Sequence, residues 1–227
     1  RPNAPWGDPL IIPKPTHLCR IFSLNVNGIP ATLLHDKGTR DYSNKLRCLA
    51  QQMDIKSIDI GCYSETNLDW SFPNVRYLYR RNLQDFCTGL TSIESDSTIH
   101  FNSAYKPGGT STTANATWTT RICHKFQDAY GRWSGFSFQG SNGRLCHVLT
   151  VYQATYQDPT VHSRSTYAQQ RSMFLTEGRP TFDSRRNFHT DLINLVQSLT
   201  TETSGIILCG DFNTNLRSPS NRLGIGL

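Results

Sequence analysis

The sequence lacks the features that identify several common classes of protein. Its seven cysteines are odd in number and include no C-x-x-C pair, so neither a zinc site nor a full disulfide framework is indicated. No signal peptide is recognisable, and no apolar run reaches the roughly 20 residues of a membrane-spanning helix. The motifs G-x-x-x-x-G-K-[ST], H-E-x-x-H and G-x-S-x-G are also absent. We therefore expect no membrane association, and we interpret the cysteines as buried free thiols in a reducing, intracellular compartment.

What the sequence does contain is the composition of a basic globular domain. Its 227 residues can bury a sizeable core, and a hydrophobic content of 37% argues against wholesale disorder. A formal charge of +6 favours a polyanionic partner such as nucleic acid, although many basic proteins bind none. Five prolines in residues 1–16 predict an extended lead-in or linker, followed by one domain over residues 17–227.

Helices alternate with short apolar strands along the chain, which predicts an α/β fold. Apolar residues at helical spacing predict amphipathic helices over residues 43–57 and 188–199. Each of these helices leads into a short apolar strand that ends at an acid, Glu65 in the first case and Asp211 in the second. In such folds, functional sites are built at the ends of strands.

The middle of the chain is rich in strand-forming residues. Stretches at residues 98–101, 132–138 and 145–153 predict strands, with a loop at 105–113 between the first two. Residues 153–187 are polar and predict a long surface connection that carries some helix around 167–175.

Five polar residues lie at or just beyond the ends of predicted strands: Asn25, Asn27, Glu65, Asp211 and Asn213. Taken singly, each is typical of a turn or a helix cap. Taken together, carboxylate and amide oxygens are the hard donors that Mg²⁺ and Mn²⁺ select. A metal held by only one or two carboxylates keeps bound water and stays open to a phosphate.

Four motifs combine these residues in a recognisable order: SLNVNGI, CYSETNLDW, LTVYQ and LCGDFNTN. In this order they resemble the endonuclease/exonuclease/phosphatase superfamily with the deoxyribonuclease-I-like fold. The resemblance covers about residues 19–217 and is closest to the apurinic-type endonuclease domain of non-LTR retrotransposons. It implies a four-layer α/β sandwich, in which two facing β-sheets are flanked by helices.

The resemblance also implies a metal site. Glu65 would be the principal ligand of Mg²⁺ or Mn²⁺, and Asp211 and Asn213 would complete the set of donors. Asn27 stands where many family members have Asp, so its metal contact would be direct or through water.

Catalytic roles follow from the same resemblance. Asn25 would orient the acidic cluster around Glu65, and Tyr152 would contact the scissile phosphate or support the nucleophile. Asp211 would orient or deprotonate the attacking water, and Asn213 would hold a phosphate oxygen. The implied activity is metal-dependent nicking of DNA by the endonuclease domain of a retroelement polyprotein, fused to a reverse transcriptase, for which the nucleus is one candidate location.

Basic residues offer a track for the DNA backbone. Candidates flank the predicted loops, and residues 76–81, RYLYRR, interleave basic and aromatic side chains. An ordinary solvated strand explains that stretch at least as well. The flanking candidates are Arg40, Lys106, Arg121, Arg132 and Arg164.

One family segment is missing. The sequence contains no Ser-Asp-His stretch, and only fourteen residues follow Asn213. We therefore expect a chain that is truncated before the final strands of its second half and is weak or inactive by itself. Two alternatives remain open: a superfamily phosphomonoesterase acting on inositol phosphates or lipids, and a non-catalytic relic or binding module that retains the fold.

Overall fold

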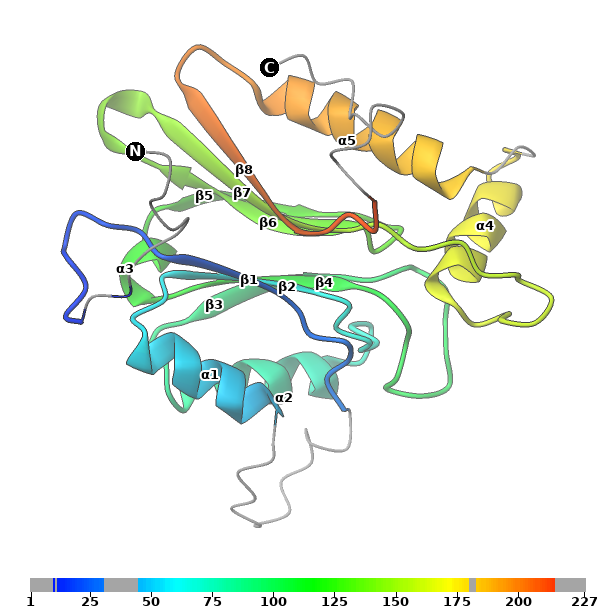
Figure 1. The fold of residues 1–227 in the computed structure, drawn as a ribbon, viewed down its shortest axis with the longest axis horizontal. Helices are drawn as coiled ribbons and strands as arrows, with labels where there is room; N and C mark the ends of the chain where they lie inside the picture. The colour runs from blue at the N-terminus through cyan, green and yellow to red at the C-terminus, as the bar shows by residue number, and fades with distance from the viewer. Residues whose placement is uncertain (1–9, 11, 31–44, 180–182, 215–227) are drawn as a thin grey trace, which may run out of the picture.

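Two four-stranded sheets face each other in the computed structural model, and helices cover their outer sides (Figure 1). The structure describes residues 10, 12–30, 45–179 and 183–214, so Arg40 and most of the expected lead-in 1–16 lie outside it. The first sheet has the order β1 (Ile21–Asn25), β2 (Ile60–Ser64), β4 (Thr110–Ala114), β3 (Thr91–Ser95). The second has the order β5 (Ile122–Gln127), β6 (Trp133–Gln139), β7 (Leu145–Tyr152), β8 (Ser204–Asp211).

The longer helices are α1 (Lys45–Ile55), α2 (Pro73–Gln84), α4 (Thr166–Thr176) and α5 (Ser184–Leu199). Of these, α1, α2 and α5 form the two outer layers, and α4 lies at one end of the sandwich (Figure 1). A short helix α3 (Ala116–Thr119) and a 3₁₀ turn η2 (Ser141–Gly143) lie in connections. The apolar stripes of α1 and α2 pack on the first sheet, and Phe188 and Leu192 of α5 pack against Trp133 and Leu149 of the second. The predicted four-layer α/β sandwich is therefore confirmed.

The space between the sheets holds a second core with a polar layer beside it. Ile60, Cys62 and Ala114 of the first sheet meet residues of β6 and β7. Close by, the hydroxyls of Thr112 and Thr150 lie 2.6 Å apart, which joins the two sheets by a buried hydrogen bond. Because both hydroxyls are satisfied, these buried polar groups do not cost the fold their full desolvation energy.

The pairing of the strands brings four carboxyl ends to one edge of the sandwich. β1 runs parallel to β2, with Asn25 opposite Ser64, and β7 runs parallel to β8, with Tyr152 opposite Asp211. β1 lies against β8, and β2 against β7, across the interface. The residues at these four strand ends therefore converge, although they come from distant parts of the chain.

Three predictions of local structure are wrong. Residues 76–81 belong to helix α2, whose apolar residues lie on the first sheet at helical spacing, and not to a strand. Residues 110–113, predicted as loop, form β4, which is buried although it consists of Thr, Ser and one Ala. Residues 98–101 lie in no strand, because β3 already ends at Ser95.

The cysteines are less uniformly buried than expected. Cys62 and Cys87 lie in the core, but Cys19, Cys48 and Cys123 are exposed. Cys48 lies on α1 outside that helix's stripe of buried residues, and Cys123 lies on β5, an edge strand of the second sheet. Apolar neighbours in the sequence therefore do not bury these two thiols. Over the part of the chain that the structure describes, no helix is long and apolar enough to cross a membrane.

Candidate active site

A single amide bridges two carboxylates that come from different sheets. The Nδ2 atom of Asn25 donates to Oε2 of Glu65 at 2.9 Å and to Oδ2 of Asp211 at 2.7 Å. Oδ1 of Asn25 accepts from the backbone N–H of Asn27 at 2.8 Å. Both amide hydrogens and the amide oxygen are thereby used, so the orientation of the Asn25 side chain is fixed. The two acids that the sequence analysis paired are brought together here.

The backbone around Glu65 is held in an uncommon conformation. Glu65 has φ +57° and Asn67 has φ +55°, in the left-handed region that costs a non-glycine residue about 1 kcal/mol or more. Hydrogen bonds on both sides maintain the turn: Gly28 N–H donates to the Glu65 carbonyl at 2.8 Å, and Asn67 N–H to the Gly108 carbonyl at 2.8 Å. The Asn67 side chain also accepts from Gly108 N–H at 2.7 Å. The turn that carries Glu65 is therefore tied to two separate loops.

Asp211 is placed by a tight approach between β8 and β7. Gly210 has φ +132°, and a Cβ there would lie 1.9 Å from the carbonyl oxygen of Val151, so only glycine fits. Just after it, the backbone N–H of Asn213 donates to Oδ1 of Asp211 at 2.8 Å, and Nδ2 of Asn213 donates to the Gln153 carbonyl at 2.7 Å. Asn213 thus fixes Asp211 and joins it to the segment that follows β7.

Tyr152 ends β7 and is 6% exposed. Burial raises the pKa of its hydroxyl, and the negative charges of Glu65 and Asp211 raise it further, while a hydrogen bond with Thr166 opposes them. Without a bound cation, the hydroxyl therefore keeps its proton at neutral pH, and Tyr152 can donate a hydrogen bond.

Asn27 lies beside the cluster and is less closely integrated. It has φ +44° and an exposed side chain, and its backbone carbonyl accepts from Nζ of Lys45 at 3.4 Å. Its link to Asn25 runs through the backbone, and no hydrogen bond from its side chain to Glu65 or Asp211 occurs among the described residues. Its predicted contact with a metal stays a prediction.

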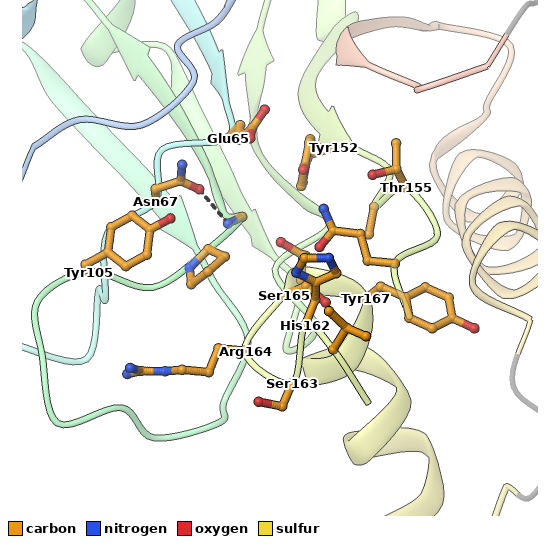
Figure 2. Close-up of a pocket in the computed structure, with 16 residues that line it drawn as sticks. Glu65, Asn67, Tyr105, Tyr152, Thr155, His162, Ser163, Arg164, Ser165 and Tyr167 are labelled. Carbon is orange, nitrogen blue, oxygen red and sulfur yellow. Dashed lines mark hydrogen bonds between the residues drawn. The ribbon is translucent and has the colours of Figure 1, made fainter. Parts of the chain in front are cut away.

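A hollow of about 400 Å³ opens next to the cluster (Figure 2). Glu65 and Tyr152 lie at one end of it, with Tyr105 on one side and Tyr167 on the other. No pattern in the sequence marks these flanking tyrosines as part of a site. Ser165 is the N-cap of α4, and its side chain accepts a hydrogen bond from Ala168 N–H at 3.2 Å. This cap fixes where the connection after β7 ends and α4, which carries Tyr167, begins.

Two of the basic residues proposed for a phosphate track are instead buried in ion pairs. Lys106 is 2% exposed, and its Nζ lies 2.9 Å from Oδ2 of Asp96. Arg132 lies 2.8 Å from Asp128 and 2.7 Å from Asp191. That prediction is wrong for both residues, because the loops that they flank fold their charges inward onto acidic partners.

The remaining basic candidates are distributed unevenly. Arg164 is exposed and lines the hollow, with its guanidinium 4.8 Å from the ring centre of Phe101. Arg121 is exposed beside Trp118 and is not part of that lining. Of the basic candidates that the structure describes, Arg164 alone contributes to the lining of this hollow, and Figure 2 shows its side chain directed away from Glu65.

The donors at the cluster fit a hard cation. The structure's described residues include no group of three or more His, Cys, Asp or Glu side chains placed to hold a metal. The cluster instead offers two carboxylates, Glu65 and Asp211, to which Asn25 presents its NH₂ group and not its oxygen. That donor set suits Mg²⁺ or Mn²⁺, which bind through one or two carboxylates and retain waters.

Similar folds occur among solved structures of enzymes. No protein-family model and no curated protein matches the sequence. An AP endonuclease from Leishmania major superposes with a TM-score of 0.50 at 16% identity, over 87% of this chain and 55% of that one. An endonuclease/exonuclease/phosphatase family protein from Leptotrichia buccalis gives 0.48 at 15%, over 89% and 71%, and a mannosyl-6-phosphatase from Bacteroides thetaiotaomicron gives 0.49 at 13%, over 90% and 68%.

The chain therefore shares the fold of the Leishmania major AP endonuclease, which agrees with the fold that the sequence motifs predicted. The chain spans just over half the length of the Leishmania enzyme. At such low identity the likeness concerns the fold, and the function has to be argued from the site.

Proposed function

We propose that this chain carries a divalent-metal-dependent phosphodiesterase site that nicks DNA. The observation that supports it is the Asn25 amide bridging Glu65 and Asp211, at 2.9 and 2.7 Å, where the two sheets end together. Two carboxylates held this close repel each other, and a bound cation would relieve that repulsion. A site that concentrates negative charge in this way gains most from a divalent metal.

The chemistry of phosphodiester hydrolysis suits these residues. A metal held by Glu65 and Asp211 would neutralise charge on the phosphate and on the leaving oxygen. Asp211 would orient the attacking water and accept its proton. Tyr152 would donate a hydrogen bond to a phosphate oxygen. Asn213 uses one amide hydrogen on the Gln153 carbonyl, which leaves the second for the phosphate.

Asn25 has a positioning role in this proposal. Its side chain donates to both acids and does not itself reach for the substrate. Without it, the two carboxylates would lose the group that sets their separation. Asn27 lies next to this position and is proposed as an outer metal contact through water.

Nucleic acid is the substrate that the composition favours. The formal charge of +6 favours a polyanion, and Arg164 lines the hollow next to Glu65. The finer proposal, an endonuclease domain of a retroelement polyprotein fused to a reverse transcriptase, is supported by the order of the four motifs that contain Asn25, Glu65, Tyr152 and Asp211.

Nicking of supercoiled plasmid with the protein in excess tests the proposal, because a single turnover reveals even a slow site. With Mg²⁺, we expect Glu65→Gln to lower the nicking rate by a factor of about 10² to 10³, as when a group that stabilises developing charge is removed. Glu202→Gln is the matched control, since Glu202 is exposed in the turn before β8 and should be neutral. Equal nicking by the Glu65 variant and the wild type would refute the proposal, as would preferential release of phosphate from inositol phosphates.

A further inference from the structure

Two hollows lie on either side of residues 153–157, and each reaches the candidate site. The first is the hollow of about 400 Å³ that Glu65 and Tyr152 line. The second, also about 400 Å³, is lined by Asn213, Arg185 and Tyr156. Tyr167 contributes to both linings. A substrate that extends in both directions from one phosphate would occupy both hollows, whereas a small phosphomonoester needs only one.

An exposed aromatic pair lies where the hollows meet. Tyr156 is 72% exposed, and its ring centre lies 5.0 Å from that of Tyr167 at an interplanar angle of 71°. Tyr167 stands in the first turn of α4, two residues after the N-cap Ser165, so the helix fixes the backbone that carries its ring. The edge-to-face contact in turn orients Tyr156, which leaves most of that ring open to solvent.

The surroundings of this pair suit a nucleotide. Arg164 lines the first hollow, with its guanidinium over the Phe101 ring, and Arg185 lines the second, so each hollow has one cationic side chain in its lining. Phosphates on either side of a base would meet these cations, while the base meets the ring. Base–aromatic stacking tolerates any sequence, because every base has a π-face.

We propose that the Tyr156–Tyr167 pair stacks an unpaired nucleic-acid base next to the scissile phosphate. The substrate class is therefore a single-stranded or locally unpaired polynucleotide. In an intact duplex each base is covered by its neighbours and offers no face to Tyr156, so pairing would prevent this contact. The inference deepens the proposed function and rests on it.

Binding of fluorescently labelled oligonucleotides tests the inference, measured by anisotropy without divalent metal so that no cleavage occurs. For a single strand at low ionic strength, we expect Tyr156→Ala to raise the Kd by about 5- to 150-fold, the range that stacking of one base supplies. Tyr156→Phe keeps the ring and should bind like the wild type. For a duplex of the same sequence, Tyr156→Ala should leave the Kd unchanged.

Phe72→Ala is the matched control. Phe72 is a 38% exposed aromatic residue directly before α2, and it lines neither hollow. Its loss should change binding to neither strand form, and urea denaturation should show that both alanine variants are folded.

The inference is overturned if Tyr156→Ala binds single strands as tightly as the wild type, if it weakens duplex binding equally, or if the wild type binds no DNA. The proposed function fails separately. If Glu65→Gln nicks plasmid normally while Tyr156→Ala still loses single-strand affinity, the chain binds unpaired bases but does not hydrolyse DNA at this cluster.

Discussion

Replacing Asn25 by Asp tests the bridge at the centre of the candidate site. The substitution keeps the shape of the side chain but exchanges its two donated hydrogen bonds for a third carboxylate. The displaced Nδ2 atom lies 2.9 Å from an oxygen of Glu65 and 2.7 Å from an oxygen of Asp211. Without a cation, the variant must therefore place three negative charges together or rearrange the strand ends.

These distances give the size of the effect. Two unit charges about 2.8 Å apart repel by about 1.5 kcal/mol in water, so two new contacts cost about 3 kcal/mol. Loss of the two hydrogen bonds adds about 1 kcal/mol each. The free energy of unfolding should fall by about 3 to 5 kcal/mol for Asn25→Asp, against about 2 kcal/mol for Asn25→Ala, which loses only the hydrogen bonds.

Urea denaturation with EDTA or with Mg²⁺ measures this difference. In EDTA, Asn25→Asp should be less stable than Asn25→Ala, and added salt should narrow the gap because the charges are partly exposed. Mg²⁺ should restore Asn25→Asp more than it restores Asn25→Ala, since the third carboxylate adds a ligand. Adding Glu65→Gln to Asn25→Asp should recover about half of the repulsion.

The reasoning is refuted if Asn25→Asp and Asn25→Ala are equally stable in EDTA. Equal stability would mean that the charges of Glu65 and Asp211 are too far from position 25, or too well screened, to interact with it. A stability of Asn25→Asp that Mg²⁺ leaves unchanged would contradict the metal-binding part of the account.

Three further predictions concern the frame around the site. Gly210→Ala should lower the urea midpoint by the equivalent of about 2 kcal/mol or more, because its Cβ would meet the Val151 carbonyl; an unchanged midpoint would contradict the geometry of β8. Burial lowers the pKa of His147 below 6.5 in the folded chain. As the pH falls, this imidazole therefore takes up a proton more readily in the unfolded chain, and the free energy of unfolding decreases as the pH falls through the folded pKa. His147→Gln should therefore show a shallower fall in urea midpoint than the wild type as the pH is lowered from neutrality. Lys106→Met should lower the free energy of unfolding by about 3 to 5 kcal/mol, because it leaves the buried carboxylates unpaired. Adding Asp96→Asn should recover part of that loss in the same denaturation assay.

Asn25, Glu65 and Asp211 could be recognised as candidates because each lies at or just after the end of a short apolar strand. Parallel pairing explains why Asn25 and Glu65 meet, whereas Asp211 reaches them from the facing sheet. The alternation of helices and apolar strands predicted α/β layers, whereas the arrangement in two facing sheets was implied by the resemblance of the four motifs to a known superfamily.

Other features depend on tertiary contacts that no local pattern records. β4 has almost no apolar residue, and its Thr112 hydroxyl is accommodated by partners on β6 and β7. Arg132 finds Asp191 far along the chain, so the sequence could not show that its charge is turned inward. Of the tyrosines beside the site, Tyr105 and Tyr156 belong to connections and Tyr167 to the first turn of α4, so their positions depend on how the surrounding elements pack.

The most direct measurement of the central claim is a double-mutant cycle on plasmid nicking, with Glu65→Gln, Asp211→Asn and the combined variant compared under single-turnover conditions with Mg²⁺. Residues that act on one reacting phosphate are not additive, so the combined variant should nick about as slowly as the slower single variant. If the two losses multiply, or if neither substitution slows nicking, then Glu65 and Asp211 do not form one hydrolytic centre.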